Sequence, residues 1–161
     1  MTLVEGWARS SLPLALASLL LACGPSGSAS RDASAASSSS SAGEQCLADA
    51  RAERHPPASA PDRISVRHIL VRHRELTRPD GATRTPEEAC VRALEALERL
   101  QAGTDWSAVV AQYSDAKTDD LGEVSRDLLS PAFGNAAFEL ASGELSYVVE
   151  TDRGFHVILR K

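Results

Sequence analysis

Two histidines stand where an ionisable ring is unusual, in the middle of apolar strand-like segments. His68 lies between Val66 and Leu70, and Ile158 flanks His156 on the same face. Imidazole is the side chain that gains or loses a proton near neutral pH, so each ring could take part in proton transfer. A histidine in such a setting is more often a hydrogen-bonded residue of the core, and the pattern alone leaves both interpretations open.

Apolar side chains gather in the stretch from Leu121 to Glu144. Ser130-Pro131 predicts a helix start, with Ser as the N-cap and Pro as the first helical residue. Leu129 and Phe133 would then lie together at the mouth of this helix, while Phe138 is expected to point into a core. On periodicity alone, a capped helix packed on a sheet explains these residues.

A third feature is basic. In a chain of formal net charge −5, residues 63–84 contain only Glu75 and Asp80 as acids against six arginines: Arg63, Arg67, Arg72, Arg74, Arg78 and Arg84. A local basic patch on an acidic protein indicates more about its partners than the overall charge does. Nucleic acid is not expected as a partner, because no aromatic residues are interleaved with the arginines.

The elements that position these residues follow from periodicity. Residues 64–72 alternate as a strand covered on both sides, with Val66 and His68 on one face and Ile69 and Val71 on the other. The segment that follows the strand carries the turn signal Pro79-Asp80-Gly81.

Two helices and a hairpin complete the pattern. Thr85-Pro86-Glu87-Glu88 is a capping box, and the helix it starts is expected to carry three leucines and Cys90 inward. These leucines are Leu94, Leu97 and Leu100. A second helix, starting near Asp105, is expected to bury residues at helical spacing. These are Trp106, Val109, Val110 and Tyr113. Residues 147–151 and 155–160 predict two strands joined at Asp152-Arg153-Gly154. The result is an α+β domain with one sheet.

Several motifs then keep a recognisable order. They are Val66 to Val71, Tyr113-Ser114-Asp115, Leu121-Gly122-x-Val124-Ser125-Arg126, Phe133 and Phe138, Gly143-Glu144-Leu145-Ser146, and Thr151-Asp152-x-Gly154-Phe155-His156-Val157-Ile158. With these motifs, residues 64–161 resemble a parvulin-type peptidyl-prolyl cis-trans isomerase (rotamase) domain. The resemblance implies a four-stranded antiparallel-type sheet flanked by about three helices, in the order β-α-α-β-α-β-β.

The implied reaction is rotation about the bond that precedes proline, which faces a barrier of about 18–20 kcal/mol. It needs an apolar cup for the proline ring and groups that bind the twisted amide better than either planar form. In the family, the positions of Leu129 and Phe133 line that cup, and Val124 extends it. Plain core residues are the alternative.

The resemblance also assigns the polar residues. His68 and His156 fall at the paired-histidine positions, which implies linked imidazoles, with Thr151 as a further partner, that support the pocket's geometry more than they transfer protons. Asp115 either acts electrostatically near the twisted amide or caps the following loop. Many parvulins carry a Cys after this Asp, and here that position is Ala116, so covalent catalysis there is excluded.

One branch of the parvulins recognises phosphoserine or phosphothreonine before proline with a basic cluster. The matching positions here are Arg72, Thr77 and Arg78, of which two are basic. Guanidinium groups suit bidentate binding of phosphate or carboxylate. The alternative is a solvated surface in which the arginines pair with Glu75 and Asp80. We expect a preference for an acidic residue before proline.

Residues 1–22 are typical of an export signal. Arg9 and the amino terminus are positive, and residues 12–22 form an apolar run too short to span a bilayer permanently. Leu20-Leu21-Ala22-Cys23 resembles the bacterial lipobox, which would make Cys23 the lipidated first residue; an ordinary cleaved signal is the alternative. The expected location is the bacterial cell envelope, anchored by lipid and facing the periplasm, at the outer rather than the inner membrane.

Residues 23–62 are rich in Ser, Ala, Gly and Pro, and are predicted to be a disordered tether, because they bury too little apolar surface to offset the entropy of ordering. Residues 44–54 could form a short helix carrying Cys46. Cys90 is expected to be a small core residue, and whether it pairs with Cys46 stays open. No cysteines have metal-ligand spacing, so neither a metal nor a cofactor is expected.

Residues 63–161 are therefore expected to form a peptidyl-prolyl isomerase that acts, as a membrane-tethered monomer, on proline-containing polypeptides that have been exported. A proline-peptide-binding chaperone module with weak catalysis is the alternative, suggested by Ala116 and a short loop at residues 117–120. A structural lipoprotein that merely docks is a third. Turnover of a proline peptide separates the first two, and binding of such a peptide separates the last two.

Overall fold

The sheet is built around β1 (Arg63–Val71), whose alternating side chains serve two layers of the molecule. The computed structural model describes the backbone of residues 32–161 and the side chains of residues 41–161. The predictions of a signal in residues 1–22 and a lipidated Cys23 lie outside the described residues. On β1, Val66 packs into one apolar cluster, while Ile69 and Val71 pack into another. The predicted strand covered on both sides is confirmed.

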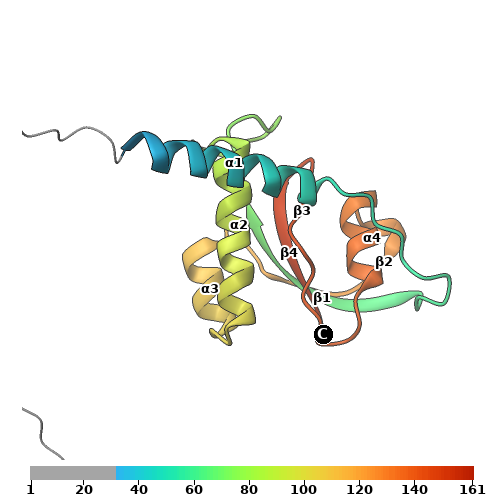
Figure 1. Cartoon of the computed structure of the whole chain (residues 1–161). Coiled ribbons are helices and arrows are strands. Elements are labelled where there is room, and N and C mark those ends of the chain that lie inside the picture. The colour runs from blue at the N-terminus through green and yellow to red at the C-terminus, as the bar shows by residue number, and fades with distance from the viewer. Residues whose placement is uncertain (1–31) are drawn as a thin grey trace, which may run out of the picture. The chain divides into compact units, whose positions relative to one another are not determined.

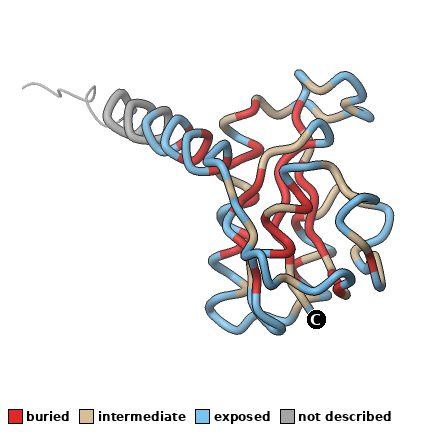
Figure 2. The backbone as a smooth tube through the Cα atoms, turned by 90° about the vertical axis from the view of Figure 1, so that its right-hand side faces the viewer, coloured by how far each residue is buried: buried red, intermediate tan, exposed pale blue. Residues whose placement is uncertain are grey.

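The other strands flank β1 in an antiparallel arrangement. They are β2 (Asp120–Ser125), β3 (Val149–Thr151) and β4 (Gly154–Arg160), and the sheet order is β2-β1-β4-β3 (Figure 1). All three pairings are antiparallel, and in the central one His68 lies opposite Ile158 and Leu70 opposite His156. The predicted α+β fold with one four-stranded antiparallel sheet is confirmed. The buried positions concentrate in the strands and on the inner faces of the helices (Figure 2).

Helices α2 (Pro86–Gln101) and α3 (Trp106–Tyr113) cover one face of the sheet. The capping box at the start of α2 forms as predicted, because Thr85 Oγ1 accepts from the Glu88 amide while the Glu88 carboxylate accepts from the Thr85 amide. The buried stripe of α2 is made mostly of small residues: Ala89, Cys90, Ala93, Ala96 and Leu97. Leu94 was expected to point inward and is instead 36% exposed. It follows the fully buried Ala93 by one residue, and so lies about 100° around the helix from Ala93, at the edge of the buried stripe.

Helix α4 (Pro131–Glu139) covers the opposite face, after a 3-10 turn η1 (Arg126–Leu128). Ser130 occupies the predicted N-cap position in an extended conformation, although its side chain makes no capping hydrogen bond. Phe133 and Phe138 are both buried, at 5% and 1% exposure. Figure 1 shows α4 on the other side of the sheet from α2 and α3, so β1 and β4 are covered on both faces.

A further helix, α1 (Asp32–Ala50), precedes the sheet and packs across α2 (Figure 1). Cys46 is disulfide-bonded to Cys90, and Leu47 and Ala50 are buried beside it. Gly43 allows close approach, because a Cβ there would lie 2.7 Å from the Cβ of Glu87. Residues 41–50 of the predicted disordered tether instead pack on the domain, because the bridge to α2 and the burial of Cys46, Leu47 and Ala50 offset the entropy of ordering. No helix in the described part of the chain is long and apolar enough to cross a membrane.

Candidate active site

The two histidines meet on the face of the sheet that α4 covers. His68 on β1 and His156 on β4 are 8% and 2% exposed, and their rings stack with centroids 5.3 Å apart. Their Nδ1 atoms are 3.1 Å apart, which is a hydrogen-bond distance. The resemblance implied neighbouring, linked imidazoles, and the structure brings them together directly, with Thr151 at the outer end of the pair.

The contacts of the pair select one arrangement of protons. His68 Nε2 lies 3.2 Å from the carbonyl oxygen of Thr118, which can only accept, so Nε2 carries the proton and Nδ1 of this ring accepts. His156 must then donate from Nδ1, which leaves its Nε2 as an acceptor for the Thr151 hydroxyl 2.8 Å away. One directional chain thus runs from Thr151 through both rings to the Thr118 carbonyl.

Both rings are neutral at physiological pH. Burial lowers the pKa of His156 to about 3, and the neighbouring His68 ring and the charge of Arg153 act in the same direction. Burial also lowers the pKa of His68, although the hydrogen bond to the Thr118 carbonyl opposes this shift. A proton added to His68 would set its Nδ1–H against the Nδ1–H of His156, and a proton added to Nε2 of His156 would force the Thr151 hydroxyl to turn from donor to acceptor. The pair is therefore a rigid, uncharged support rather than a store of protons.

An apolar cleft of about 380 Å³ opens above the pair. Phe133 packs its ring edge-on against His156 and His68, at centroid distances of 5.1 and 5.8 Å. The lining residues come from β1, β2, η1, α4 and the β3–β4 hairpin: His68, Leu121, Val124, Leu128, Leu129, Ser130, Phe133, Thr151, Asp152, Arg153 and His156. All three predicted cup residues, Leu129, Phe133 and Val124, line it.

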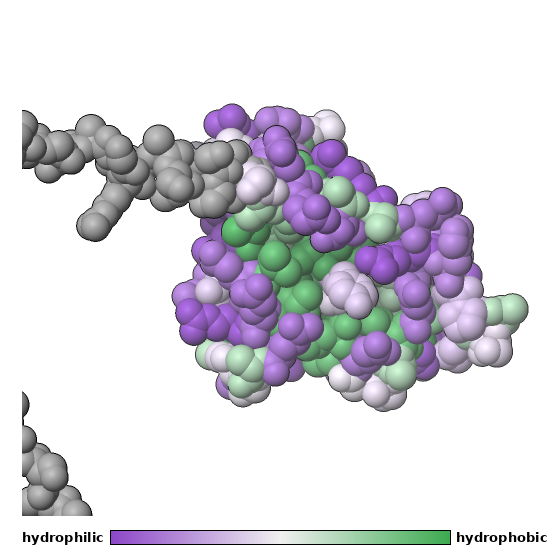
Figure 3. All heavy atoms as spheres, viewed as in Figure 1, coloured by the Kyte–Doolittle hydropathy of each residue, from purple (hydrophilic) through white to green (hydrophobic). Residues whose placement is uncertain are grey.

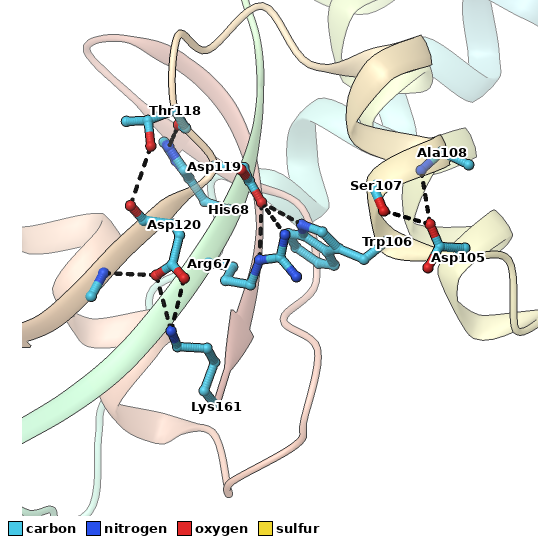
Figure 4. A network of polar contacts seen from close by, with 11 residues as sticks. Arg67, His68, Asp105, Trp106, Ser107, Ala108, Thr118, Asp119, Asp120 and Lys161 are labelled. Carbon is cyan, nitrogen blue, oxygen red and sulfur yellow. Dashed lines mark hydrogen bonds and ion pairs between the residues drawn. The ribbon is translucent and has the colours of Figure 1, made fainter.

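The loop between α3 and β2 fixes the position of His68 (Figure 4). The backbone amide of His68 donates to the carbonyl oxygen of Asp119, at a distance of 2.7 Å. The Asp119 carboxylate accepts from Trp106 Nε1 at 2.7 Å and from Arg67 Nε at 2.9 Å. Burial works against this carboxylate, but the hydrogen bonds from Trp106 and Arg67 outweigh burial and lower the pKa of Asp119. The short loop is thus anchored at both the backbone and the side chain.

Comparison with known proteins identifies the family of the chain that carries this cleft. Residues 68–161 match the Rotamase family, described as the PPIC-type PPIase domain. The chain belongs to this family. It is 39% identical over 113 residues to the peptidyl-prolyl cis-trans isomerase pin1 of Schizosaccharomyces pombe, covering 64% of this chain and 65% of that protein. It is 36% identical over 102 residues to chaperone SurA of Aromatoleum aromaticum, covering 60% of this chain and 22% of that protein.

The fold agrees with the sequence comparison. The structure of the peptidyl-prolyl isomerase ESS1 from Candida albicans is similar, with a TM-score of 0.59, 31% sequence identity, and coverage of 62% of this chain and 63% of that one. The chain is thus a peptidyl-prolyl cis-trans isomerase of the parvulin, or PPIC, type. It spans about two thirds of the length of pin1 and of ESS1, and about a fifth of SurA.

In this parvulin domain Asp115 holds structure together and does not line the cleft. One of its carboxylate oxygens, Oδ2, accepts from the Arg72 amide and from Arg84 Nη1, both at 2.8 Å. It borders a different cavity with Arg84 and Lys117. The carboxylate therefore has a structural role, but not the predicted one, because its hydrogen bonds go to the end of β1 and to Arg84 rather than to the loop that follows it. Asp115 ties the end of β1 to the segment that leads into α2, and it is not a member of the catalytic cleft.

The predicted basic cluster forms, in part. Arg72, Thr77 and Arg78 line one cavity of about 410 Å³ beside the cleft. The Arg72 guanidinium, whose side chain is only 21% exposed, pairs with Asp80 and donates to the Arg78 carbonyl oxygen. For Arg72, the structure therefore shows the predicted alternative, in which the arginine pairs with Asp80.

Five residues that line the cleft were not predicted from the sequence, and Arg153 matters most among them. Leu121, Leu128 and Ser130 extend the cup, while Asp152 and Arg153 come from a hairpin that was interpreted only as a turn. Arg153 lines both the apolar cleft and the basic cavity. Its position between Thr151 and His156 in the sequence was the one available signal.

Proposed function

We propose that this isomerase rotates X-Pro bonds of exported polypeptides without a covalent intermediate, and that it prefers an acidic residue before the proline. The observation that carries the proposal is the apolar cleft whose floor is a buried, neutral histidine pair. The cleft can accept a proline ring against Phe133. It offers the reacting amide a drier surrounding than bulk water.

The mechanism follows from amide resonance. A planar amide has separated charge on nitrogen and oxygen, and twisting it removes this separation, so a poorly hydrated site disfavours the planar form more than the twisted one. Phe133 and Leu129 hold the ring in place, which leaves the preceding carbonyl to turn. His68, His156 and Thr151 keep the floor rigid. Ala116 supplies no nucleophile at the position where many parvulins carry Cys, which supports a non-covalent rotation.

Arg153 is the cation best placed to meet the residue before proline. It lines both the apolar cleft and the basic cavity, whereas Arg72 and Arg78 line the basic cavity but not the cleft. No described side chain forms a hydrogen bond or an ion pair with the Arg153 guanidinium, while Arg72 is paired with Asp80. A carboxylate or phosphate adjacent to the proline ring would therefore meet Arg153 first, with Arg72 and Arg78 adding to the field.

The substrate preference is tested with short peptides that differ only before proline, carrying Glu, phosphoserine or Ala. The acidic peptides should have a kcat/KM about 1.5- to 5-fold above the Ala peptide, the range that exposed ion pairs of 0.2–1 kcal/mol support. The advantage should shrink as salt rises and in the Arg153→Gln variant. Arg99→Gln, a matched loss of charge on the exposed side of α2, should retain it. Equal rates for all peptides at low salt would reject the preference.

Export is supported by the signal-like sequence before Cys23 and by the disulfide between Cys46 and Cys90, since stable disulfides belong mostly to oxidising compartments. We infer a lipoprotein anchored at Cys23 in the cell envelope, facing the periplasm. The protein expressed with its signal should partition with membranes, and the Cys23→Ser variant should not. A soluble wild-type protein would reject the anchor and leave the isomerase assignment untouched.

A further inference from the structure

A second groove, of about 620 Å³, lies between the end of α1, the hairpin strand β3 and helix α4. One wall is formed by residues 50–54, and the other by residues of α4 and β3 that include Ala132, Asn135 and Val149. We propose that this groove is a substrate subsite, which binds an extended, largely apolar segment of the polypeptide immediately after the proline. The direction of binding rests on the proposed acidic preference before proline.

The first argument is continuity with the cleft. Thr151 lines both the cleft and the groove, while Asp152 and Arg153 line both the cleft and the basic cavity. Three consecutive residues of one hairpin thus border three adjoining cavities, with the proline cleft in the middle. A chain whose residue before proline lies at Arg153 must leave the cleft on the Thr151 side, where the groove begins.

The second argument is the chemistry of the groove. Ala50, Ala132 and Val149 present small apolar side chains, so a peptide backbone can approach closely. The Asn135 side chain offers both a donor and an acceptor to such a backbone, and no described residue forms a hydrogen bond with it. At the rim, Arg51 pairs with Glu150, with Nη2 and Oε1 3.2 Å apart, so the rim carries little net charge. Figure 3 shows an apolar area below α1, between α2 and α4, and a mostly hydrophilic surface toward α4.

The third argument is that one wall lies outside the PPIC-type domain. The family match begins at residue 68, whereas Ala50 to Arg54 form the end of α1 and the chain that follows it. The disulfide between Cys46 and Cys90 holds this wall against α2, and the Arg51–Glu150 pair holds it against β3. The subsite is thus a property of this chain, assembled when α1 is docked.

The test measures peptide affinity rather than turnover, so that its outcome is separate from that of the proposed catalysis. Three labelled peptides share one Glu-Pro core: the core alone, the core extended after proline by about four apolar residues, and the core extended by the same residues before glutamate. Four extended residues reach about 13 Å. Fluorescence anisotropy with the full chain should show roughly tenfold tighter binding for the extension after proline, which burial of about 60 Å² of apolar surface supports. The other extension should show little gain.

Filling the groove should remove the gain. Ala132→Trp and, from the opposite wall, Ala52→Trp should each bring the affinity ratio of long to short peptide close to one. Ala111→Trp, on the exposed side of α3, is the matched control and should retain the wild-type ratio. Cys46→Ser/Cys90→Ser should lower the ratio by releasing the α1 wall. Equal affinities for the short peptide and the peptide extended after proline, or a gain that both filling variants retain, would overturn the proposal. Binding that favours the extension before glutamate would overturn its direction.

Discussion

The disulfide between Cys46 and Cys90 should be a major source of stability for this domain. Its cysteines are 44 residues apart in the sequence. In the chain-entropy treatment, closing a loop of that size stabilises the folded state by about 4 kcal/mol, because the bridge restricts the unfolded chain. That is a large share of the 5–15 kcal/mol that is typical of folded domains. The Cys46→Ser/Cys90→Ser variant should therefore be folded but much less stable.

Urea unfolding measures this directly. With an m-value of about 2 kcal/mol per molar, the midpoint should fall by about 2 M in the double variant. Adding a reductant should lower the urea midpoint of the wild-type protein by the same amount, and it should leave the midpoint of the variant unchanged. A shift of only a few tenths of a molar in both experiments would refute the argument. It would mean that α1 is held by packing alone or that the unfolded chain is already constrained.

Three further predictions concern stability, each measured by urea unfolding. As the pH is lowered from about 6.5 to 3, the free energy of unfolding should decrease, with His156 contributing up to about 1.4 kcal/mol per pH unit. The reason is that His156 becomes protonated in this range in the unfolded chain but not in the folded one. The His156→Gln variant should lose that part of the pH dependence. Gly154→Ala should destabilise strongly, because φ is +128° and a Cβ would meet the Val71 carbonyl oxygen. Thr85→Ala should cost about 1 kcal/mol, and Ser130→Ala less, because Ser130 makes no capping bond.

The central elements were predictable because local patterns and tertiary packing agree there. The alternation of residues 64–72 identified β1 and both of its faces, and Thr85-Pro86-Glu87-Glu88 located the start of α2. The cup residues and the paired imidazoles came from a resemblance, since apolar residues near a helix start and lone histidines in strands have ordinary structural explanations. The structure then supplied the proton arrangement, which depends on the Thr118 carbonyl and could not be deduced from sequence spacing.

The misses have a common physical cause, since each depended on a contact distant in sequence. Residues 41–50 belong to a stretch with the composition of a tether, and the bridge to a cysteine 44 residues away, together with the burial of Leu47 and Ala50, makes them part of the domain. Leu94 was placed inward because leucine is apolar, whereas alanines form the inner stripe and let α1 and the sheet approach α2. Arg153 lies in a turn, where local sequence does not determine which cavity a side chain will border.

The most direct test of the account is the exchange rate between cis and trans Glu-Pro in a short peptide, measured by NMR exchange spectroscopy with catalytic amounts of the full chain. Uncatalysed exchange takes tens to hundreds of seconds, and the wild-type protein should bring it within reach of the experiment. Phe133→Ala should abolish the acceleration while the domain stays folded. Phe138→Leu, which changes a buried ring on the same helix that does not line the cleft, should retain it. A folded Phe133→Ala variant with wild-type catalysis would contradict the assignment of the cleft.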